Sequence, residues 1–154
     1  MGEALKRRIK QAKFDSPVKE AIFNLMVAAD FVREQMDRVC ALHGLTHGQY
    51  NVLRILKGVY PEGHPRCEIS GRMLERAPDV TRLVDRLEKQ GLAVRDRSAA
   101  DRRHSLTRIT KKGLALMDEL NTEVGELFKL FGVKLSRKDA RELSRICEGI
   151  YEEK

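Results

Sequence analysis

Several residue types that particular classes of protein need are scarce in this sequence. It contains no Trp, and aromatic residues make up 5% of its 154 positions, so recognition of single-stranded nucleic acid by base stacking is not favoured. No apolar run reaches the ~18 residues of a membrane-spanning helix. The first residues, MGEALKRRIKQAKF, lack the apolar core of a signal peptide. We therefore expect a cytoplasmic protein with no membrane partner.

Cysteine is also scarce. Cys40, Cys67 and Cys147 form neither a CxxC pair nor an obvious disulfide framework, and idle or buried thiols are the default interpretation in a reducing compartment. Cys40 could alternatively sense oxidants. Together with His43 and His47 it could also bind zinc, but no paired His follows to complete such a site. We predict no metal and no cofactor.

Motifs of catalytic sites are missing as well. The sequence has no Gly-rich phosphate-binding loop, no Ser-His-Asp set in recognisable motifs and no close carboxylate pair in a recognisable cleft. We predict that the protein is not an enzyme, and we assign no catalytic residue.

Positive charge, by contrast, is abundant. Lys and Arg number 30 against 23 Asp and Glu, which gives a net charge of +7. A basic excess favours a polyanionic partner. The length suits one domain, or one domain with an extension, and is enough to bury a real core.

Residues 78–90 have the pattern of an amphipathic helix. Pro78 suits the first helical position, and Gly91 suits the end. Apolar residues recur at three- and four-residue steps on one face: Val80, Leu83, Val84 and Leu87. The other face carries Arg82, Asp85, Arg86 and Lys89, with Thr81 at its flank.

A β-hairpin is predicted directly after this helix. Residues 92–97 begin apolar, residues 98–101 suit a turn, and residues 104–109 alternate polar and apolar positions. Arginines occupy its first arm and its tip: Arg95, Arg97, Arg102 and Arg103. A helix with a basic face followed by an Arg-rich hairpin is the layout of a winged helix. The helix can enter a major groove, and the hairpin can reach phosphates or a narrow minor groove.

The N-terminal part of the chain is predicted to be helical. Residues 1–15 are a basic extension that could contain a short helix. Residues 16–45 contain a helix that Ser16 and Pro17 begin and Gly44 ends. Its apolar residues form two stripes, more than one small core requires, which suggests packing against a second subunit.

The middle of the chain contains the pieces of a helix-turn-helix. A capping-box pattern begins a helix at Thr46, and residues 58–65, rich in Pro and Gly, are predicted to be a loop. Residues 68–74 are the first helix of the helix-turn-helix, and residues 75–77 form its turn, which offers no obvious side-chain cap. The inward side chains of that first helix are expected to be Ile69, Met73 and Leu74. After the hairpin, Thr110 and Ser136 cap two further helices.

Several ordered segments resemble the MarR family, the multiple-antibiotic-resistance-type transcription regulators. They are THGQYNVLRIL at 46–56, VTRLVDRLE at 80–88 followed by Gly91-Leu92, DRR at 101–103 and LTRITKKG at 106–113. The resemblance implies a mainly α fold with a small β-hairpin wing, a winged helix-turn-helix with N- and C-terminal dimerisation helices. The expected parts are the 1–15 extension, a 16–45 dimerisation helix, a 46–109 DNA-binding lobe and 110–154 dimerisation helices.

The recognition helix supplies the candidates for base contacts. Arg82 and Arg86 are the strongest, since Arg grips guanine with two hydrogen bonds. Thr81 could touch a thymine methyl or a phosphate. Asp79 and Asp85 could accept from cytosine, but an Asp in such a place more often orients a neighbouring Arg.

The remaining candidates flank that helix. The resemblance implies that Asp101 shapes the wing tip and that Arg103 enters the minor groove. Phosphate contacts, which position a protein without reading sequence, are expected from Ser70, Arg72, Arg95, Arg97, Arg102 and Arg108.

The predicted function is a sequence-specific regulator that binds double-stranded DNA. By resemblance, it acts as a homodimeric repressor on a palindromic operator and responds to a small aromatic or anionic effector. The alternative is a winged-helix module for protein assembly or for non-specific nucleic-acid binding. Competitor DNA separates the two, because a specific binder keeps about 10³-fold or more preference for its site.

Overall fold

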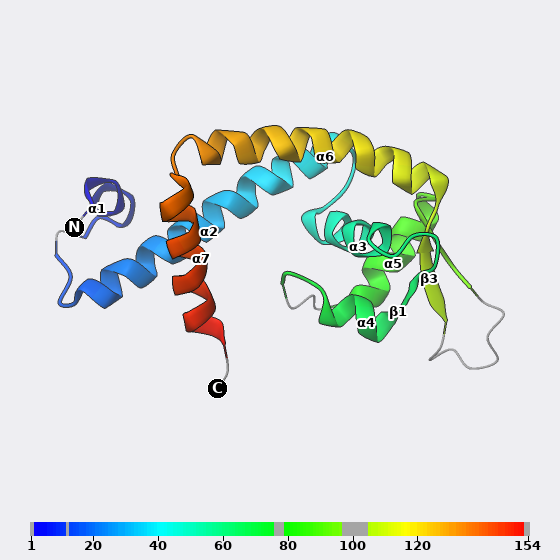
Figure 1. The fold of residues 1–154 in the computed structure, drawn as a ribbon, viewed down its shortest axis with the longest axis horizontal. Coiled ribbons are helices and arrows are strands. Elements are labelled where there is room, and N and C mark those ends of the chain that lie inside the picture. Colours follow the sequence, from blue (N-terminus) through cyan, green and yellow to red (C-terminus); the bar gives the residue numbers. More distant parts are fainter. Residues whose placement is uncertain (1, 12, 76–78, 97–104, 153–154) are drawn as a thin grey trace. The chain divides into compact units, whose positions relative to one another are not determined.

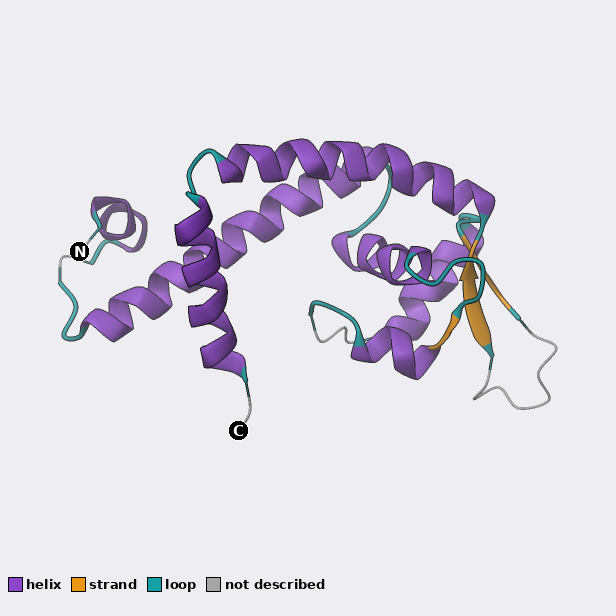
Figure 2. Ribbon diagram, viewed as in Figure 1, coloured by secondary structure: helices purple, strands orange, loops and turns teal. Residues whose placement is uncertain are grey.

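A computed structural model describes residues 2–11, 13–75, 79–96 and 105–152. The chain divides into two compact units, residues 1–47 and 48–154. Within the described residues the fold is mainly helical with one small sheet (Figure 2). This confirms the predicted fold class. No described helix is long and apolar enough to cross a membrane.

The first unit consists of a short helix and a long one (Figure 1). The long helix, α2, spans Pro17–Leu42 and begins as predicted, with the Ser16 hydroxyl accepting from the Val18 N–H at 3.1 Å. It ends in a Schellman motif. Gly44 adopts a φ of 68°, and the Leu45 N–H donates to the Cys40 carbonyl at 3.1 Å.

The basic extension forms a helix, α1 (Glu3–Ile9), which contacts α2. The Gly2 backbone N–H donates to Glu20 at 3.0 Å, and Arg8 pairs with Asp30 at 3.5 Å. The Leu5 side chain is buried. The described part of the extension is therefore folded back on the long helix.

The second unit contains the remaining helices and strands. In chain order these are α3 (His47–Lys57), β1 (His64–Pro65), α4 (Arg66–Gly71), α5 (Val80–Lys89), β2 (Ala93–Arg95), β3 (Leu106–Ile109), α6 (Lys111–Gly132) and α7 (Arg137–Tyr151). Aliphatic side chains from α3, α4, α5 and α6 fill its core. The largest fully buried ones include Leu53, Leu56, Ile69, Leu87, Met117 and Leu120.

The sheet confirms the predicted hairpin and adds a strand to it. Strands β2 and β3 are antiparallel, with Ala93 opposite Ile109 and Arg95 opposite Thr107. The segment predicted to be only a loop ends in β1, which pairs with the other edge of β3. Gly63 permits this approach, because a Cβ there would lie 2.5 Å from the Thr107 carbonyl oxygen. A two-residue strand has no alternation that a sequence pattern could reveal.

The first helix of the helix-turn-helix lies earlier than predicted. It spans Arg66–Gly71 and follows β1 directly, because pairing with β3 brings the chain to the helix start at Pro65. Ile69 is buried as expected. Met73 and Leu74 lie beyond the end of this helix. Met73 is half-buried, whereas Leu74 is exposed, so the predicted inward placement of Leu74 is wrong.

Helices α6 and α7 begin at the predicted caps. The Thr110 hydroxyl accepts from the Gly113 N–H at 3.0 Å, and Ser136 and Asp139 form a full capping box. Lys112, in the first turn of α6, donates to the Gln90 carbonyl at 2.8 Å. This lysine therefore satisfies a carbonyl at the end of α5, a role that helix C-termini commonly give to cations.

Candidate nucleic-acid interface

The recognition helix α5 is capped at its start by Asp79. The Asp79 Oδ1 atom accepts a hydrogen bond from the Arg82 backbone N–H at 3.1 Å. The helix begins at Val80, so the predicted start at Pro78 is wrong, and Pro78 itself lies outside the described residues. Asp79 thus supplies the side-chain cap that the sequence of the turn at residues 75–77 does not offer, and Asp is among the strongest N-cap residues.

The end of α5 is set by a Schellman motif. Gly91 has a φ of 71°, its N–H donates to the Glu88 carbonyl at 2.9 Å, and the Leu92 N–H reaches the Leu87 carbonyl at 2.9 Å. The Thr110 hydroxyl donates to the Gly91 carbonyl at 2.8 Å. The end of α5 is thus tied to the start of α6.

The two faces of α5 divide as the sequence predicts. Val80, Val84 and Leu87 are buried. On the other face 80% of the Arg82 side chain is exposed, and Arg86 is exposed too. Arg86 makes no ion pair or side-chain hydrogen bond with any residue that the structure describes. Two long cationic side chains therefore project from a helix whose back is buried.

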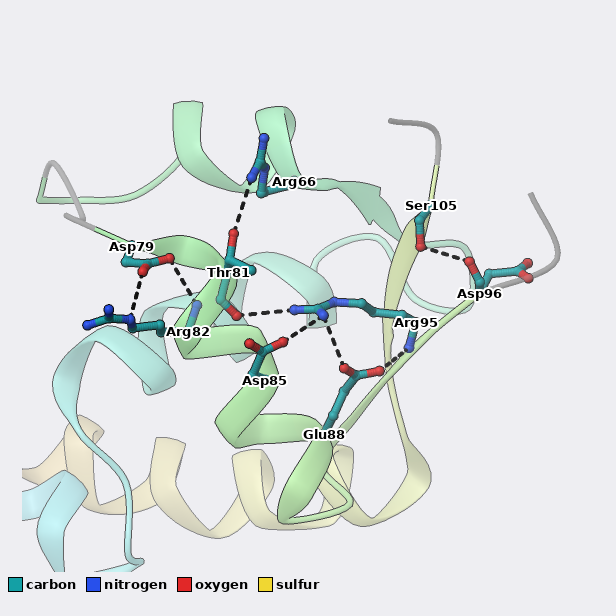
Figure 3. Close-up of polar contacts among 9 residues, drawn as sticks. All are labelled: Arg66, Asp79, Thr81, Arg82, Asp85, Glu88, Arg95, Asp96 and Ser105. Atoms are coloured by element: carbon teal, nitrogen blue, oxygen red, sulfur yellow. Dashed lines mark hydrogen bonds and ion pairs between the residues drawn. The ribbon is translucent and has the colours of Figure 1, made fainter. Parts of the chain in front are cut away.

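Asp79 also pairs with the side chain of Arg82. Its Oδ2 atom lies 3.0 Å from the Arg82 Nε atom (Figure 3). The two carboxylate oxygens thus have separate partners, since Oδ1 caps the backbone and Oδ2 contacts the guanidinium.

Arg95, a predicted phosphate contact, connects the wing to the recognition helix. Its guanidinium lies 2.6 Å from Asp85 and 3.4 Å from Glu88, and it donates to the Thr81 carbonyl at 3.1 Å (Figure 3). Its backbone N–H donates to Glu88 at 2.9 Å. Asp85 therefore orients an arginine, as such residues more often do. The Arg95 side chain, 26% exposed, is engaged with α5.

Glu88 was not among the predicted site residues. The available signal was its position three residues after Asp85 on α5, which places both carboxylates on neighbouring turns of one side. Only the packing of β2 against α5 shows that both meet Arg95.

Arg66 is a second residue that the sequence did not reveal. It is exposed at the start of α4, and its Nη1 atom donates to the Thr81 hydroxyl at 3.2 Å (Figure 3). This contact joins the two helices of the helix-turn-helix. The other predicted residues of α4 and its end, Ser70 and Arg72, are both exposed, and Arg72 pairs with Glu68 at 3.2 Å.

The base of the wing is held by contacts around Asp96. The Ser105 hydroxyl donates to the Asp96 carbonyl at 2.7 Å (Figure 3). The predicted phosphate contact Arg108 lies 3.1 Å from the Asp96 carboxylate. The predicted tip residues Arg97, Asp101, Arg102 and Arg103 lie outside the described residues.

The candidates for sensing chemistry lie elsewhere. Cys40 is fully buried, and burial, followed by the nearby Asp37 charge, raises the pKa of its thiol to about 11. Cys67 is exposed. Among the residues that the structure describes, no group of three or more His, Cys, Asp or Glu side chains could hold a metal ion.

The arrangement defines a class of protein. Helices α4 and α5 form a helix-turn-helix. The hairpin of β2 and β3, which the Arg95–Asp85 ion pair joins to α5, forms a wing. This is a winged helix-turn-helix protein.

Comparison with known proteins identifies the family. The MarR family model matches residues 45–105. A MarR transcription factor from Planctomyces limnophilus, known as a crystal structure, is 34% identical, with 88% of this chain and 98% of that chain covered and a TM-score of 0.69. The chain belongs to the MarR family of transcription regulators.

Two curated regulators are also similar. The HTH-type transcriptional regulator MhqR of Bacillus subtilis is 31% identical over 58% of this chain, and the match spans 60% of that regulator's length. The homoprotocatechuate degradative operon repressor of Escherichia coli is 25% identical, over 69% of this chain and 70% of its own.

Proposed function

We propose that the protein is a transcription regulator that binds double-stranded DNA, with α5 in the major groove and the wing on the flanking backbone or minor groove. The main support for this proposal is that Arg82 and Arg86 project from the exposed face of α5. The opposite face of that helix is buried, and both of its ends are capped. Such a helix presents rigid donors to base edges. Arg95 keeps the wing beside it.

A homodimer is the proposed binding form. Several large apolar side chains are exposed on α7: Leu143, Ile146, Ile150 and Tyr151. Others are exposed on α2, including Val18, Met26 and Phe31. Helix faces of this kind suit burial against a second copy. A symmetric dimer requires a palindrome whose half-sites lie about 34–36 Å apart.

The proposed regulation is repression that a small aromatic or anionic effector relieves. The E. coli relative is named a homoprotocatechuate degradative operon repressor, and this name supports the first part, repression. The aromatic acid in that name belongs to the effector class expected from family resemblance. No residue of this chain is assigned to the effector.

The test is a binding assay on fragments from around the gene, with excess non-specific DNA and several salt concentrations. Arg82→Ala and Arg86→Ala are compared with Arg141→Ala, which removes the same charge from an exposed position on α7. We expect a symmetric footprint that resists competitor and is lost in the two α5 variants only.

Two other outcomes would contradict the proposal. Binding that is uniform across fragments, sensitive to salt and unchanged by Arg82→Ala would identify a non-specific binder. Absence of binding at low salt would favour the protein-assembly module.

A further inference from the structure

We infer that Asp79 is a positioning residue that orients Arg82 toward a guanine. The inference rests on the proposed function and deepens it. Its basis is the way in which one carboxylate serves two groups: Oδ1 caps the helix through the Arg82 N–H at 3.1 Å, and Oδ2 lies 3.0 Å from Arg82 Nε. One residue therefore sets both where α5 begins and where its first long cation points.

The choice of Nε leaves the end of the guanidinium available. Within the described residues, the Arg82 side chain has no ion pair or hydrogen bond apart from the pair with Asp79, in which Nε is the Arg82 atom nearest to the carboxylate. The side chain is 80% exposed. Arginine reads guanine with two parallel donors aimed at O6 and N7. A carboxylate beside Nε fixes the plane of the guanidinium group without occupying its two terminal nitrogens.

Orientation matters because a free arginine samples many rotamers. Holding it before DNA arrives lowers the entropy lost on binding. The pair is solvent-exposed, so it orients Arg82 without trapping it. The same carboxylate also brings negative charge close to the DNA, which weakens contacts with any sequence that offers no guanine in the right place. Asp79 should therefore sharpen discrimination while reducing affinity for DNA in general.

The capping role and the orienting role can be separated by one substitution. Asn is as good an N-cap as Asp, so Asp79→Asn keeps an oxygen acceptor for the Arg82 N–H. The other group becomes an amide NH₂, which donates and cannot accept from Nε. Asp79→Asn thus removes the tether while leaving the cap.

The experiment measures binding to the operator and to versions in which each G·C pair of one half-site is replaced in turn. The proteins are wild type, Asp79→Asn, Arg82→Ala and the double variant. For one guanine we expect Asp79→Asn to reduce the wild-type preference about tenfold. Affinity for competitor DNA should be unchanged or higher. Arg82→Ala should abolish the same preference, and adding Asp79→Asn to it should cause no further loss.

A purely structural Asp79 would behave differently. Equal loss of binding on every sequence, together with a lower unfolding temperature, would overturn the inference and leave Asp79 as a cap only. The inference would also be overturned if the wild type binds specifically and Asp79→Asn keeps the same preference for guanine. That outcome would leave the proposed function intact. Wild-type protein without any competitor-resistant binding would instead overturn the proposed function, and the inference with it.

Discussion

Single residues of this protein often serve two elements at once. Asp79 caps α5 and pairs with Arg82, and Thr110 caps α6 while donating to the end of α5. Arg95 is the extreme case, because one side chain from β2 meets two carboxylates and a backbone carbonyl of α5. Substitutions of such residues should show which of their contacts contribute to folding stability and which contribute to DNA binding.

Replacing Arg95 by Met should loosen the wing. The change leaves the half-buried Asp85 and Glu88 carboxylates near each other without their shared cation. We expect a loss of about 1–2 kcal/mol in the free energy of unfolding, measured in urea. DNA binding should weaken evenly on all sequences.

The control for Arg95→Met is Arg145→Met. Arg145 forms an exposed pair with Glu142 within α7, and solvent screens such exposed pairs, so its loss should leave the urea midpoint nearly unchanged. Equal urea midpoints for Arg95→Met and wild type would show that Arg95 does not secure the wing.

Cys40 should be slow to react with thiol reagents. Its pKa of about 11, against an ordinary value of 9.0, lowers the thiolate fraction at pH 8 about a hundredfold. Alkylation by iodoacetamide, followed by mass spectrometry, should therefore label the exposed Cys67 first. Both should react alike in denaturant. Comparable alkylation rates for Cys40 and Cys67 in the folded protein would contradict this prediction and would favour Cys40 as an oxidant sensor.

The sign of the pH effect on stability follows from the same pKa shift. The unfolded thiol ionises near pH 9, whereas the folded one stays protonated until about pH 11. The unfolded state then binds fewer protons, so stability falls as pH rises through that window. Removing the titrating thiol by Cys40→Ala should flatten this part of the curve relative to wild type.

At the scale of elements, short connections decide how α5, the wing and α6 meet. The start of α6 lies so close to the turn after α5 that a Cβ on Gly113 would collide with the Leu92 carbonyl oxygen and lie 2.8 Å from Ile109 Cγ1. The glycine of the LTRITKKG segment is thus required for packing. Its φ is not the reason, since positive φ values among the described glycines occur only at Gly44 and Gly91.

Gly113→Ala should therefore destabilise the protein. We expect about 1–3 kcal/mol, the usual range for forcing extra volume into a packed site, measured as a shift of the urea midpoint. Gly125→Ala is the matched control on the same helix, where nothing lies within 4 Å of an added Cβ. That control should gain about 0.5–1 kcal/mol from helix propensity. A neutral Gly113→Ala would mean that α6 can shift without cost.

At the scale of the whole molecule, the proposed homodimer should bury the exposed apolar side chains of α7 against a second copy. Ile146→Asp places a charge within the α7 stripe, at a position 46% exposed. We expect the dimer dissociation constant to rise at least about tenfold, measured by analytical ultracentrifugation. The helical circular dichroism should be retained.

Arg141→Asp is the control for that change, because it introduces the same side chain on α7 away from the stripe. Dimers that survive Ile146→Asp would place the interface elsewhere. A wild type that is monomeric at all concentrations would contradict the homodimer itself.

The local patterns of the sequence determined most of the elements. Helical periodicity, caps at Ser16, Thr110 and Ser136, and stops at Gly44 and Gly91 act within a few residues, so they are visible in sequence alone. The same holds for the outward placement of Arg82 and Arg86.

Only the tertiary structure decided which side chains remain available for DNA. The addition of β1 to the sheet, the reach of Arg66 to Thr81 and the capture of Arg95 by Asp85 and Glu88 join segments well separated along the chain. No periodicity encodes such pairings, because they depend on how packed elements bring distant side chains within hydrogen-bond distance. For this reason the sequence alone predicts a basic surface without distinguishing its arginines. In the folded protein Arg95 joins the wing to α5, whereas Arg82 and Arg86 project into solvent.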